Sequence, residues 1–423
     1  MKNSRLFREQ TNNQICYIFY IALLWSKDLL CRYLYALLTA VPLVGIYANH
    51  AINVLFLAAF VLSFRSILRK LLARDLLIYV GLVLVFAWSY LFYDTSYEYY
   101  IDLGQNIARS VLPMFLIGVT LYREKDDRLF NVLYVISLLT VVCFSLYTLL
   151  FGMTDEDVAR NGNMDGAYKF LPHLCLVFGY VVKKPTITNI AIFAFGVFIT
   201  FSLGTRGVIL CLGIYIVLTM LFVRNFKHPF LFFFCAIGFI LLLVYGGIFD
   251  ILYSFAEKNG LSLRIFDKMK NGEITSGSGR DLIAERVWQF IWVFPIGGAG
   301  LFADRVATGG FYAHNLVLEI LIEFGVFLGS LLLVIIVIIL LRAFAAMRKM
   351  HDPAGFSLLL ALFCSHFVKL FLSGSYLTEG GFFLLMGFSL SVIRTYRQGI
   401  HPPLPKVQPS LPEEYDLNEG CCV

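Results

Sequence analysis

Arg206, Arg280 and His314 are the residues of this sequence whose types suit chemistry on a phosphorylated substrate. Arg206 stands in Thr-Arg-Gly, Arg280 follows Ser-Gly, and His314 precedes Asn315. A guanidinium binds phosphate oxygens through two parallel hydrogen bonds and stays charged at physiological pH. A histidine beside such a site accepts a proton from a hydroxyl nucleophile. At a membrane surface, this set predicts transfer of a group from a lipid-linked diphosphate to a hydroxyl, with no metal ion and no cofactor.

His314 also introduces a long apolar run that carries two glutamates. Residues 310–330 read GFYAHNLVLEILIEFGVFLGS, and Glu319 and Glu323 lie one helical turn apart. Charge in hydrocarbon is costly, so such residues are candidates for function. Asn315 is the predicted N-cap of this helix, whose positive end favours an anion.

Each of these residues also has a purely structural interpretation. Glu319 and Glu323 would then pair with Lys369 or Arg109 for packing, and Arg206 would anchor a turn at the lipid headgroups. Arg280 would be a solvated charge in a loop. Function is favoured for the two arginines and His314, whereas Glu319, Glu323, Asn315, Trp292 and Lys369 are supporting candidates.

The composition indicates an integral membrane protein. Of 423 residues, 59% are hydrophobic and 15% are charged, whereas soluble chains have roughly 25% charged residues. Apolar runs recur from end to end, which predicts an all-α polytopic fold. The net charge of +6 does not indicate nucleic acid, because the basic residues sit in short loops. The nine cysteines show no metal or disulfide spacing.

The apolar runs predict about twelve transmembrane helices. Residues 1–28 precede them as a cytoplasmic segment with an interfacial stretch at 15–25, and 395–423 follow as a cytoplasmic tail. The predicted spans cover 29–48, 51–65, 76–93, 107–122, 129–151, 167–182, 186–203, 207–222, 229–249, 314–341, 356–373 and 379–394.

The charges of the short loops predict the orientation, because Lys and Arg accumulate on the cytoplasmic side. Basic and acidic loops alternate along the chain, and the alternation places both termini in the cytoplasm. Arg160 and Lys169 are exceptions beside an acidic loop. The basic loops contain Arg65, Arg69, Lys70, Arg74, Arg123, Lys125, Arg128, Lys183, Lys184, Arg224, Lys227, Arg342, Arg348 and Lys349.

One external loop, residues 250–313, separates the helices of 29–249 from those of 314–394, and loops of this length are usually functional. Within it, residues 281–294 predict an amphipathic helix on the membrane surface, with Trp288 and Trp292 one turn apart and Ser278 or another small residue as its cap. The glycine-rich stretch that follows, 295–310, predicts an irregular, flexible loop beside a ligand.

The remaining charged residues in or near the spans gather towards the same predicted outer face. A transporter usually keeps its polar site near the middle of the bilayer, so this distribution favours chemistry at the external surface. The residues concerned are Arg109, His173, Arg206, His366, Lys369 and Glu379.

With these motifs in order, the chain resembles the O-antigen ligase/polymerase superfamily of bacterial envelope enzymes. The resemblance covers about 190–345 and rests on Thr205-Arg206-Gly207, Ser278-Gly279-Arg280, the tryptophan-containing helix, Pro295 to Gly300 and His314-Asn315 followed by LEILIEFGVFLG. Each motif is weak alone, whereas their order and spacing make the set fairly specific.

The resemblance implies a metal-independent glycosyltransferase at the periplasmic face of the inner membrane. The implied donor is an undecaprenyl-diphosphate-linked glycan, with Arg206 and Arg280 at the diphosphate and His314 beside the acceptor. The acceptor is another lipid-linked repeat unit in a polymerase and lipid A-core oligosaccharide in a ligase. Membrane lipids and a chain-length regulator are the other implied partners.

Four functions remain open at this point. A repeat-unit polymerase is slightly preferred to a ligase, and a protein-directed oligosaccharyltransferase belongs to the same class. A lipid-linked oligosaccharide flippase is the alternative of another class. It predicts internal repeats and a charged path across the bilayer, and neither is evident in the sequence.

Overall fold

The computed structural model describes residues 14–26, 42–92, 99, 104, 107, 111–122, 127–151, 162–203, 205–222, 254 and 279–399. Within these residues the chain is all helical and has no strand, as predicted. Four helices are long and apolar enough to cross a membrane, namely Ala73–Leu91, Arg128–Leu149, Leu316–Met350 and Pro353–Phe371. Twelve crossings therefore remain a prediction.

The helices follow the apolar runs closely. Beside an N-terminal helix at Gln14–Ser26, the labelled elements are α2 (Pro42–Lys70), α3 (Ala73–Phe92), α5 (Leu112–Leu121), α6 (Asp127–Phe151), α8 (Gly162–Lys183), α9 (Ile187–Ser202), α10 (Arg206–Phe222), α14 (Arg280–Ile291), α15 (Ala303–Thr308), α16 (Leu316–Met350), α17 (Pro353–Leu362), a π-helical turn (Phe363–Phe367), a 3₁₀ turn (Val368–Phe371) and α18 (Gly380–Arg397).

One feature of the predicted N-terminal region is wrong. The break predicted between the spans 29–48 and 51–65 does not exist, because α2 continues from Pro42 to Lys70 with no glycine or proline to interrupt its second half. The interfacial position of residues 15–25 stays a prediction. Tyr17 is buried and hydrogen-bonds Thr120 of α5, so this helix belongs to the packed bundle.

Several predictions concern residues outside those described. They include the spans 229–249 and most of 29–48, Arg109, the loop between 255 and 278 with the proposed cap Ser278, and the tail after 399.

The turns at one end of the bundle are tied together by buried polar contacts. Tyr122, at the end of α5, donates a hydrogen bond of 2.6 Å to Asp352 in the turn between α16 and α17. Arg394 near the end of α18 pairs with Asp75 in the first turn of α3. Arg348 and Lys349 lie in the last turn of α16 at this end. The opposite end contains the start of α16 and of α18.

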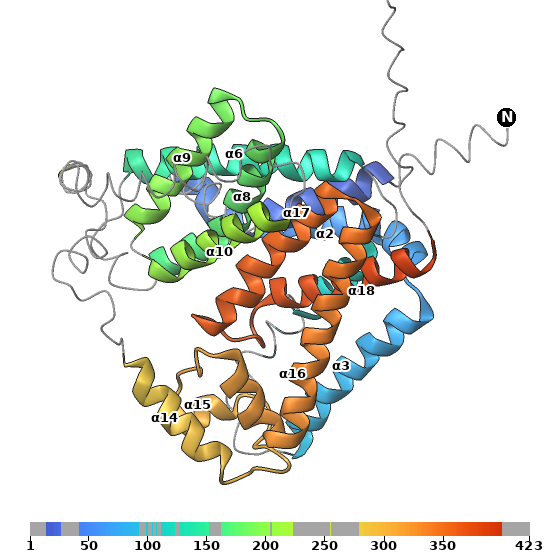
Figure 1. The fold of residues 1–423 in the computed structure, drawn as a ribbon, viewed down its shortest axis with the longest axis vertical. Coiled ribbons are helices and arrows are strands. Elements are labelled where there is room, and N and C mark those ends of the chain that lie inside the picture. Colours follow the sequence, from blue (N-terminus) through green and yellow to red (C-terminus); the bar gives the residue numbers. More distant parts are fainter. Residues whose placement is uncertain are drawn as a thin grey trace, which may run out of the picture.

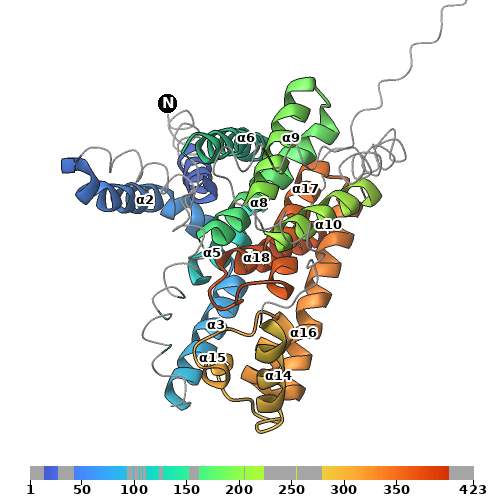
Figure 2. The ribbon, with the colours of Figure 1, turned by 90° about the vertical axis from the view of Figure 1, so that its left-hand side faces the viewer.

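Helices α14 and α15 form a small lobe against the first half of α16, away from α6, α8, α9 and α10 (Figures 1 and 2). The lobe also reaches α3, because Ser89 accepts a hydrogen bond of 2.8 Å from the backbone of Leu301. Val287 and Ile291 supply the buried face of α14, whereas Trp288 and Trp292 stay exposed. This division confirms that the segment forms an amphipathic helix.

The glycine-rich segment packs against α16 at a kink in that helix. Gly325 has φ 76° and ψ 170°, which interrupts the helix, and the carbonyls of Ile322 and Glu323 instead accept hydrogen bonds from Ala299 and Gly300 at 2.8 and 3.1 Å. Glycine is needed here, since a Cβ at Gly325 would stand 2.7 Å from the carbonyl oxygen of Ile296.

The predicted absence of regular structure in 295–310 is therefore wrong. Residues 303–308 form helix α15, and hydrogen bonds to α16 hold the segment before it. The glycines permit close backbone approach to the kinked helix. Composition alone does not distinguish this role from that of a flexible loop.

Candidate active site

A buried ion-pair network holds the segment that carries His314. Arg305 of α15 is almost fully buried, and its Nη1 lies 2.7 Å from Asp304 Oδ1 and 3.6 Å from Glu319 Oε1. Asp304 Oδ2 accepts a hydrogen bond of 2.8 Å from the backbone N–H of Ala313. The network therefore connects α15, α16 and the residue before His314.

The two glutamates of α16 hold neighbouring segments in place. Glu319 accepts hydrogen bonds from the Ser375 hydroxyl and, at 3.2 Å, from the backbone of Tyr376. Glu323 accepts from the Tyr376 hydroxyl and, at 3.1 Å, from the backbone of Phe302. Satisfied in this way, both carboxylates are buried without facing lipid.

The predicted pairing of these glutamates with Lys369 is wrong. Lys369 forms an ion pair with Glu379 instead, and His366 bonds the other oxygen of that carboxylate. The alternative partner Arg109 lies outside the described residues. Glu319 pairs with Arg305 because α15 folds against α16, a tertiary contact that no local pattern reveals.

Asp304, Glu319 and Glu323 bring carboxylate oxygens within 4.8 Å of one another, as the ligands of a metal ion would. The Arg305 guanidinium already sits among them and supplies a positive charge. Each of the three carboxylates also accepts hydrogen bonds from protein donors. This arrangement fits a structural ion-pair network better than a metal site.

His314 stands at the strained entrance to α16. Its φ is 54°, a left-handed conformation that is uncommon outside glycine. Asn315 caps the helix as predicted, since its Oδ1 accepts hydrogen bonds from Val317 and Leu318 at 2.9 and 3.3 Å. The His314 ring packs on Tyr312 with 3.9 Å between centroids. Strain of this kind is typical of functional sites.

The environment keeps the His314 imidazole neutral. Burial lowers its pKa, and the positive charge of Arg280 lowers it further, to about 4. Its Nδ1 is buried and has no hydrogen-bond partner among the described residues. The ring therefore has an unused nitrogen and is in the unprotonated form that a general base requires.

Arg280 and the turn of Arg206 meet near the same backbone. Arg280 begins α14 and donates a hydrogen bond from Nη1 to the carbonyl of Leu372. Arg206 begins α10, and a Cβ on the adjacent Gly207 would lie 3.7 Å from Leu372 Cβ. The same Cβ would lie 2.0 Å from the Tyr168 hydroxyl, so the turn that follows Arg206 packs against Tyr168 and Leu372.

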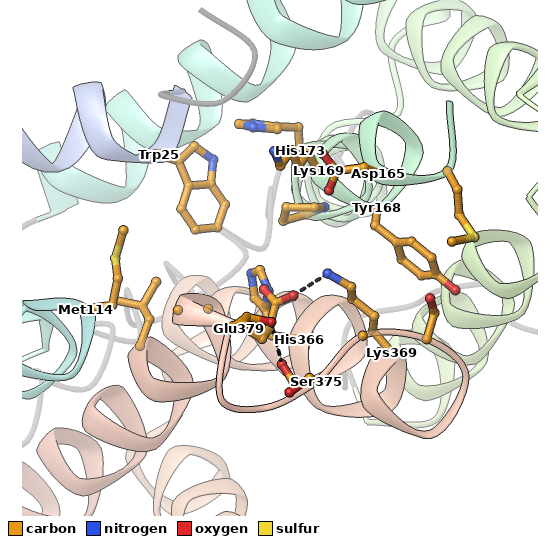
Figure 3. A pocket seen from close by; sticks show the side chains of 18 of the residues that line it. Trp25, Met114, Asp165, Tyr168, Lys169, His173, His366, Lys369, Ser375 and Glu379 are labelled. Carbon is orange, nitrogen blue, oxygen red and sulfur yellow. Dashed lines mark hydrogen bonds and ion pairs between the residues drawn. The ribbon is translucent and has the colours of Figure 1, made fainter. Parts of the chain in front are cut away.

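A cavity of about 540 Å³ opens beside this group (Figure 3). Tyr168 and Tyr312 line it, and Lys369 Nζ lies 5.1 Å from the centroid of the Tyr168 ring. Tyr312 also contacts His314, so the cavity adjoins the candidate base. Arg280 bonds the carbonyl of Leu372, the residue before Ser373 in the cavity wall.

Other predicted residues lie at different positions. Trp292 is 59% exposed and ends α14 away from the arginines' shared backbone. It packs edge-to-face on Trp288 at 5.8 Å. His173 also lines the cavity, and its buried Nδ1 lies 3.2 Å from the Ser137 hydroxyl. Lys369 lines the cavity as a supporting residue.

Sequence reasoning missed Asp304 and Arg305, the centre of the buried network, as well as Tyr168 and Tyr312. The available signal for the first pair was Ala-Asp-Arg within a glycine-rich segment, and adjacent opposite charges are common in exposed loops. Tyrosines are also abundant, with 23 in the chain. Nothing local therefore set these four residues apart.

A comparison with known families finds a match to part of the chain. Residues 190–333 match the family model described as O-antigen ligase, a segment that includes Arg206, Arg280 and His314. This match supports the resemblance of the chain to the O-antigen ligase/polymerase superfamily. Superfamily members are glycosyltransferase-like enzymes, which makes lipid-linked glycans and acceptors the general class of partner. No curated protein matches the chain.

Proposed function

We propose that this protein transfers a glycan from an undecaprenyl-diphosphate-linked donor to an acceptor hydroxyl at the periplasmic face of the inner membrane. The observation that carries the proposal is the meeting of the Arg206 turn and Arg280 at Leu372, with His314 within electrostatic reach of Arg280. Anion ligands and a neutral base are thereby combined in one region.

In the proposed reaction the acceptor oxygen attacks the anomeric carbon of the donor. The bond between that carbon and the diphosphate oxygen breaks, and undecaprenyl diphosphate leaves with the bonding electrons. The acceptor proton passes to the His314 imidazole. Arg206 and Arg280 stabilise the charge that develops on the leaving diphosphate, which is the usual function of guanidinium groups in such transfers.

Binding of the donor would also strengthen the base. The positive charge of Arg280 contributes to the low pKa of His314. A diphosphate bound at Arg280 would offset that charge and raise the His314 pKa towards neutrality. The imidazole therefore becomes a better proton acceptor when the donor is in place.

A repeat-unit polymerase is the leading form of this function, with an O-antigen ligase as the second candidate. The family match supports ligase and polymerase equally. Both use the same donor chemistry and differ in the acceptor. A lipid-linked oligosaccharide flippase is less well supported, because the charged groups of the site lie at one end of α16 and are bound in local networks.

The location and orientation are part of the same proposal. The α16–α17 and α2–α3 turns lie at the end of the bundle where Tyr122 bonds Asp352 and Arg394 pairs with Asp75, and they carry the basic residues expected in the cytoplasm. The site lies at the other end of α16. Both termini would then be cytoplasmic and the site periplasmic.

Deletion of the gene in its native host, followed by gel separation of lipid-linked and surface glycans, tests the proposal. A single repeat unit on the acceptor with no long chains supports the polymerase. Long chains that accumulate on undecaprenyl diphosphate support the ligase. Repeat units trapped on the cytoplasmic side would contradict both and indicate a flippase.

A further inference from the structure

The cavity beside His314 lacks an assigned ligand. It lies between α8, the irregular turns after α17, and the start of α18 (Figure 3). We infer that this cavity of about 540 Å³ binds the saccharide of the acceptor and directs its hydroxyl to His314. The inference rests on the proposed glycan transfer and specifies where one of the substrates lies.

The charges of the cavity favour a neutral ligand over an anion. Lys369 is paired with Glu379, and Lys169 lies 2.9 Å from Asp165. The four charged residues that line the cavity therefore cancel, in contrast to the arginines of the adjoining site. Paired charges offer both donors and acceptors, which suits the hydroxyl groups of a sugar. A diphosphate would find no excess positive charge here.

The rest of the lining has the character of a saccharide site. Its volume falls within the roughly 300–1,000 Å³ of small-molecule pockets, which combine aromatic walls with a few fixed polar groups. Trp25, Tyr168 and Tyr312 are its aromatic residues. The Tyr312 ring also contacts His314, 3.9 Å between centroids, so a sugar against Tyr312 lies next to the base.

The polar groups of the cavity are held in fixed positions. His366 Nδ1 lies 2.9 Å from Glu379 Oε1, and Lys369 occupies the second oxygen. The His366 ring rests directly on the backbone of Gly381, where an added Cβ would stand 2.1 Å from Nδ1. The chain between α17 and α18 passes through π and 3₁₀ turns, which are frequent at functional sites.

Two variants test the assignment in different ways. Glu379→Gln keeps the shape of the cavity and removes the charge that holds Lys369 and His366. Met114→Trp fills the cavity with apolar bulk and leaves those hydrogen bonds intact. Glu285→Gln, an exposed residue of α14, is the matched control.

The full-length protein in lipid nanodiscs would be titrated with two probes. One is the repeat-unit oligosaccharide released from its lipid by mild acid, and the other is undecaprenyl diphosphate without sugar. We expect Glu379→Gln to weaken oligosaccharide binding by about tenfold or more, as for a lost hydrogen bond to a charged group. Met114→Trp should weaken it as well, because the larger side chain occupies the space of the sugar. Both variants should bind undecaprenyl diphosphate as the wild type does, and Arg280→Ala should show the opposite pattern.

Three results would overturn the inference. In the first, the wild-type protein does not bind the oligosaccharide saturably. In the second, both cavity variants are monodisperse and bind the oligosaccharide normally. In the third, the cavity variants lose binding of undecaprenyl diphosphate instead. Failure of the proposed function looks different, because wild-type nanodiscs would then transfer no glycan. Transfer that persists unchanged in both cavity variants rejects the saccharide site alone.

Discussion

Asp304 holds the backbone of Ala313 through a hydrogen bond of 2.8 Å, one residue before the strained His314. The same carboxylate pairs with Arg305, which in turn reaches Glu319 of α16. The φ of 54° at His314 is thus maintained by an ion-pair network that includes no part of the imidazole itself. Asp304 is in this sense a positioning residue for the candidate base.

Replacement of Asp304 by Asn should therefore impair the site through its geometry. The amide keeps the size of the side chain but has one oxygen to serve both Arg305 and Ala313. Breaking a buried ion pair costs about 3–5 kcal/mol, and a displacement of about 1 Å lowers rate on the order of 10²-fold. We expect a lower Tm and a lower kcat for glycan transfer.

The exposed Asp281 in the first turn of α14 offers the control, since Asp281→Asn should change neither quantity. Separate measurement of KM and kcat distinguishes a positioning role of Asp304, which lowers kcat, from general instability. A variant with wild-type kcat and an unchanged pH profile would contradict the role of Asp304.

The three residues of the proposed reaction make the most direct prediction. Arg206→Ala, Arg280→Ala or His314→Ala should each reduce transfer by about 10²-fold or more, because each removes a charge ligand or the base. Membrane insertion should stay normal. The assay is transfer of labelled glycan in membrane vesicles.

Arg286→Ala is the matched control for the arginines, because Arg286 is exposed on the same helix as Arg280. Its activity should equal that of the wild type. Near-wild-type transfer in all three site variants would reject the mechanism.

The titration of His314 supplies a prediction that does not require activity. Burial, and then Arg280, lower its pKa to about 4. In Arg280→Gln the pKa should rise but stay below 6.5, because burial remains. NMR titration of histidine resonances, assigned through His314→Ala, measures both values. An unchanged pKa in Arg280→Gln would show that the two residues do not interact.

The same pKa fixes the direction of a pH effect on stability. The folded chain protonates His314 less readily than the unfolded chain, whose imidazole titrates near 6.5. The stability contributed by neutral His314 is therefore fully present above about 6.5 and decreases as pH falls towards about 4. In His314→Gln the unfolding free energy should depend less on pH across this window.

Gly325 should tolerate no side chain. Its φ of 76° is unfavourable for alanine, and the new Cβ would meet the carbonyl oxygen of Ile296 at 2.7 Å. Gly325→Ala should destabilise the protein by about 1–3 kcal/mol through backbone strain and loosen the segment before α15. Thermal unfolding in detergent measures the change.

Gly213 in α10 is the matched control, because an added Cβ there meets no atom within 4 Å. Gly213→Ala should be neutral or slightly stabilising, since alanine favours a helix. Equal Tm values for the two variants would contradict the proposed docking at the kink.

Trp292 should matter less than the arginines. It is 59% exposed at the end of α14 and takes no part in the buried network. A tryptophan at such a position suits anchoring at a membrane interface. Trp292→Ala should weaken transfer severalfold without abolishing it, and complete loss would indicate a direct role with the substrate.

The helical character of the chain and most helix limits follow from its sequence, because apolar runs, prolines and capping residues act locally. Asn315 is an example, since its amide oxygen is positioned to cap whatever helix follows it. The residue types of Arg206, Arg280 and His314 likewise indicate phosphate and proton chemistry without knowledge of the fold. Motif order was enough to indicate the superfamily.

The tertiary structure alone decided which charges meet. Glu319 contacts Arg305 of α15, and both glutamates accept hydrogen bonds from the 375–376 turn, not from Lys369. The kink at Gly325 helps by accommodating the segment before α15 against α16. The cavity depends on turns and helices distant in sequence. Coulombic attraction acts through space and becomes strong when the charges are buried. The spacing of residues along the sequence therefore does not show which charges become partners.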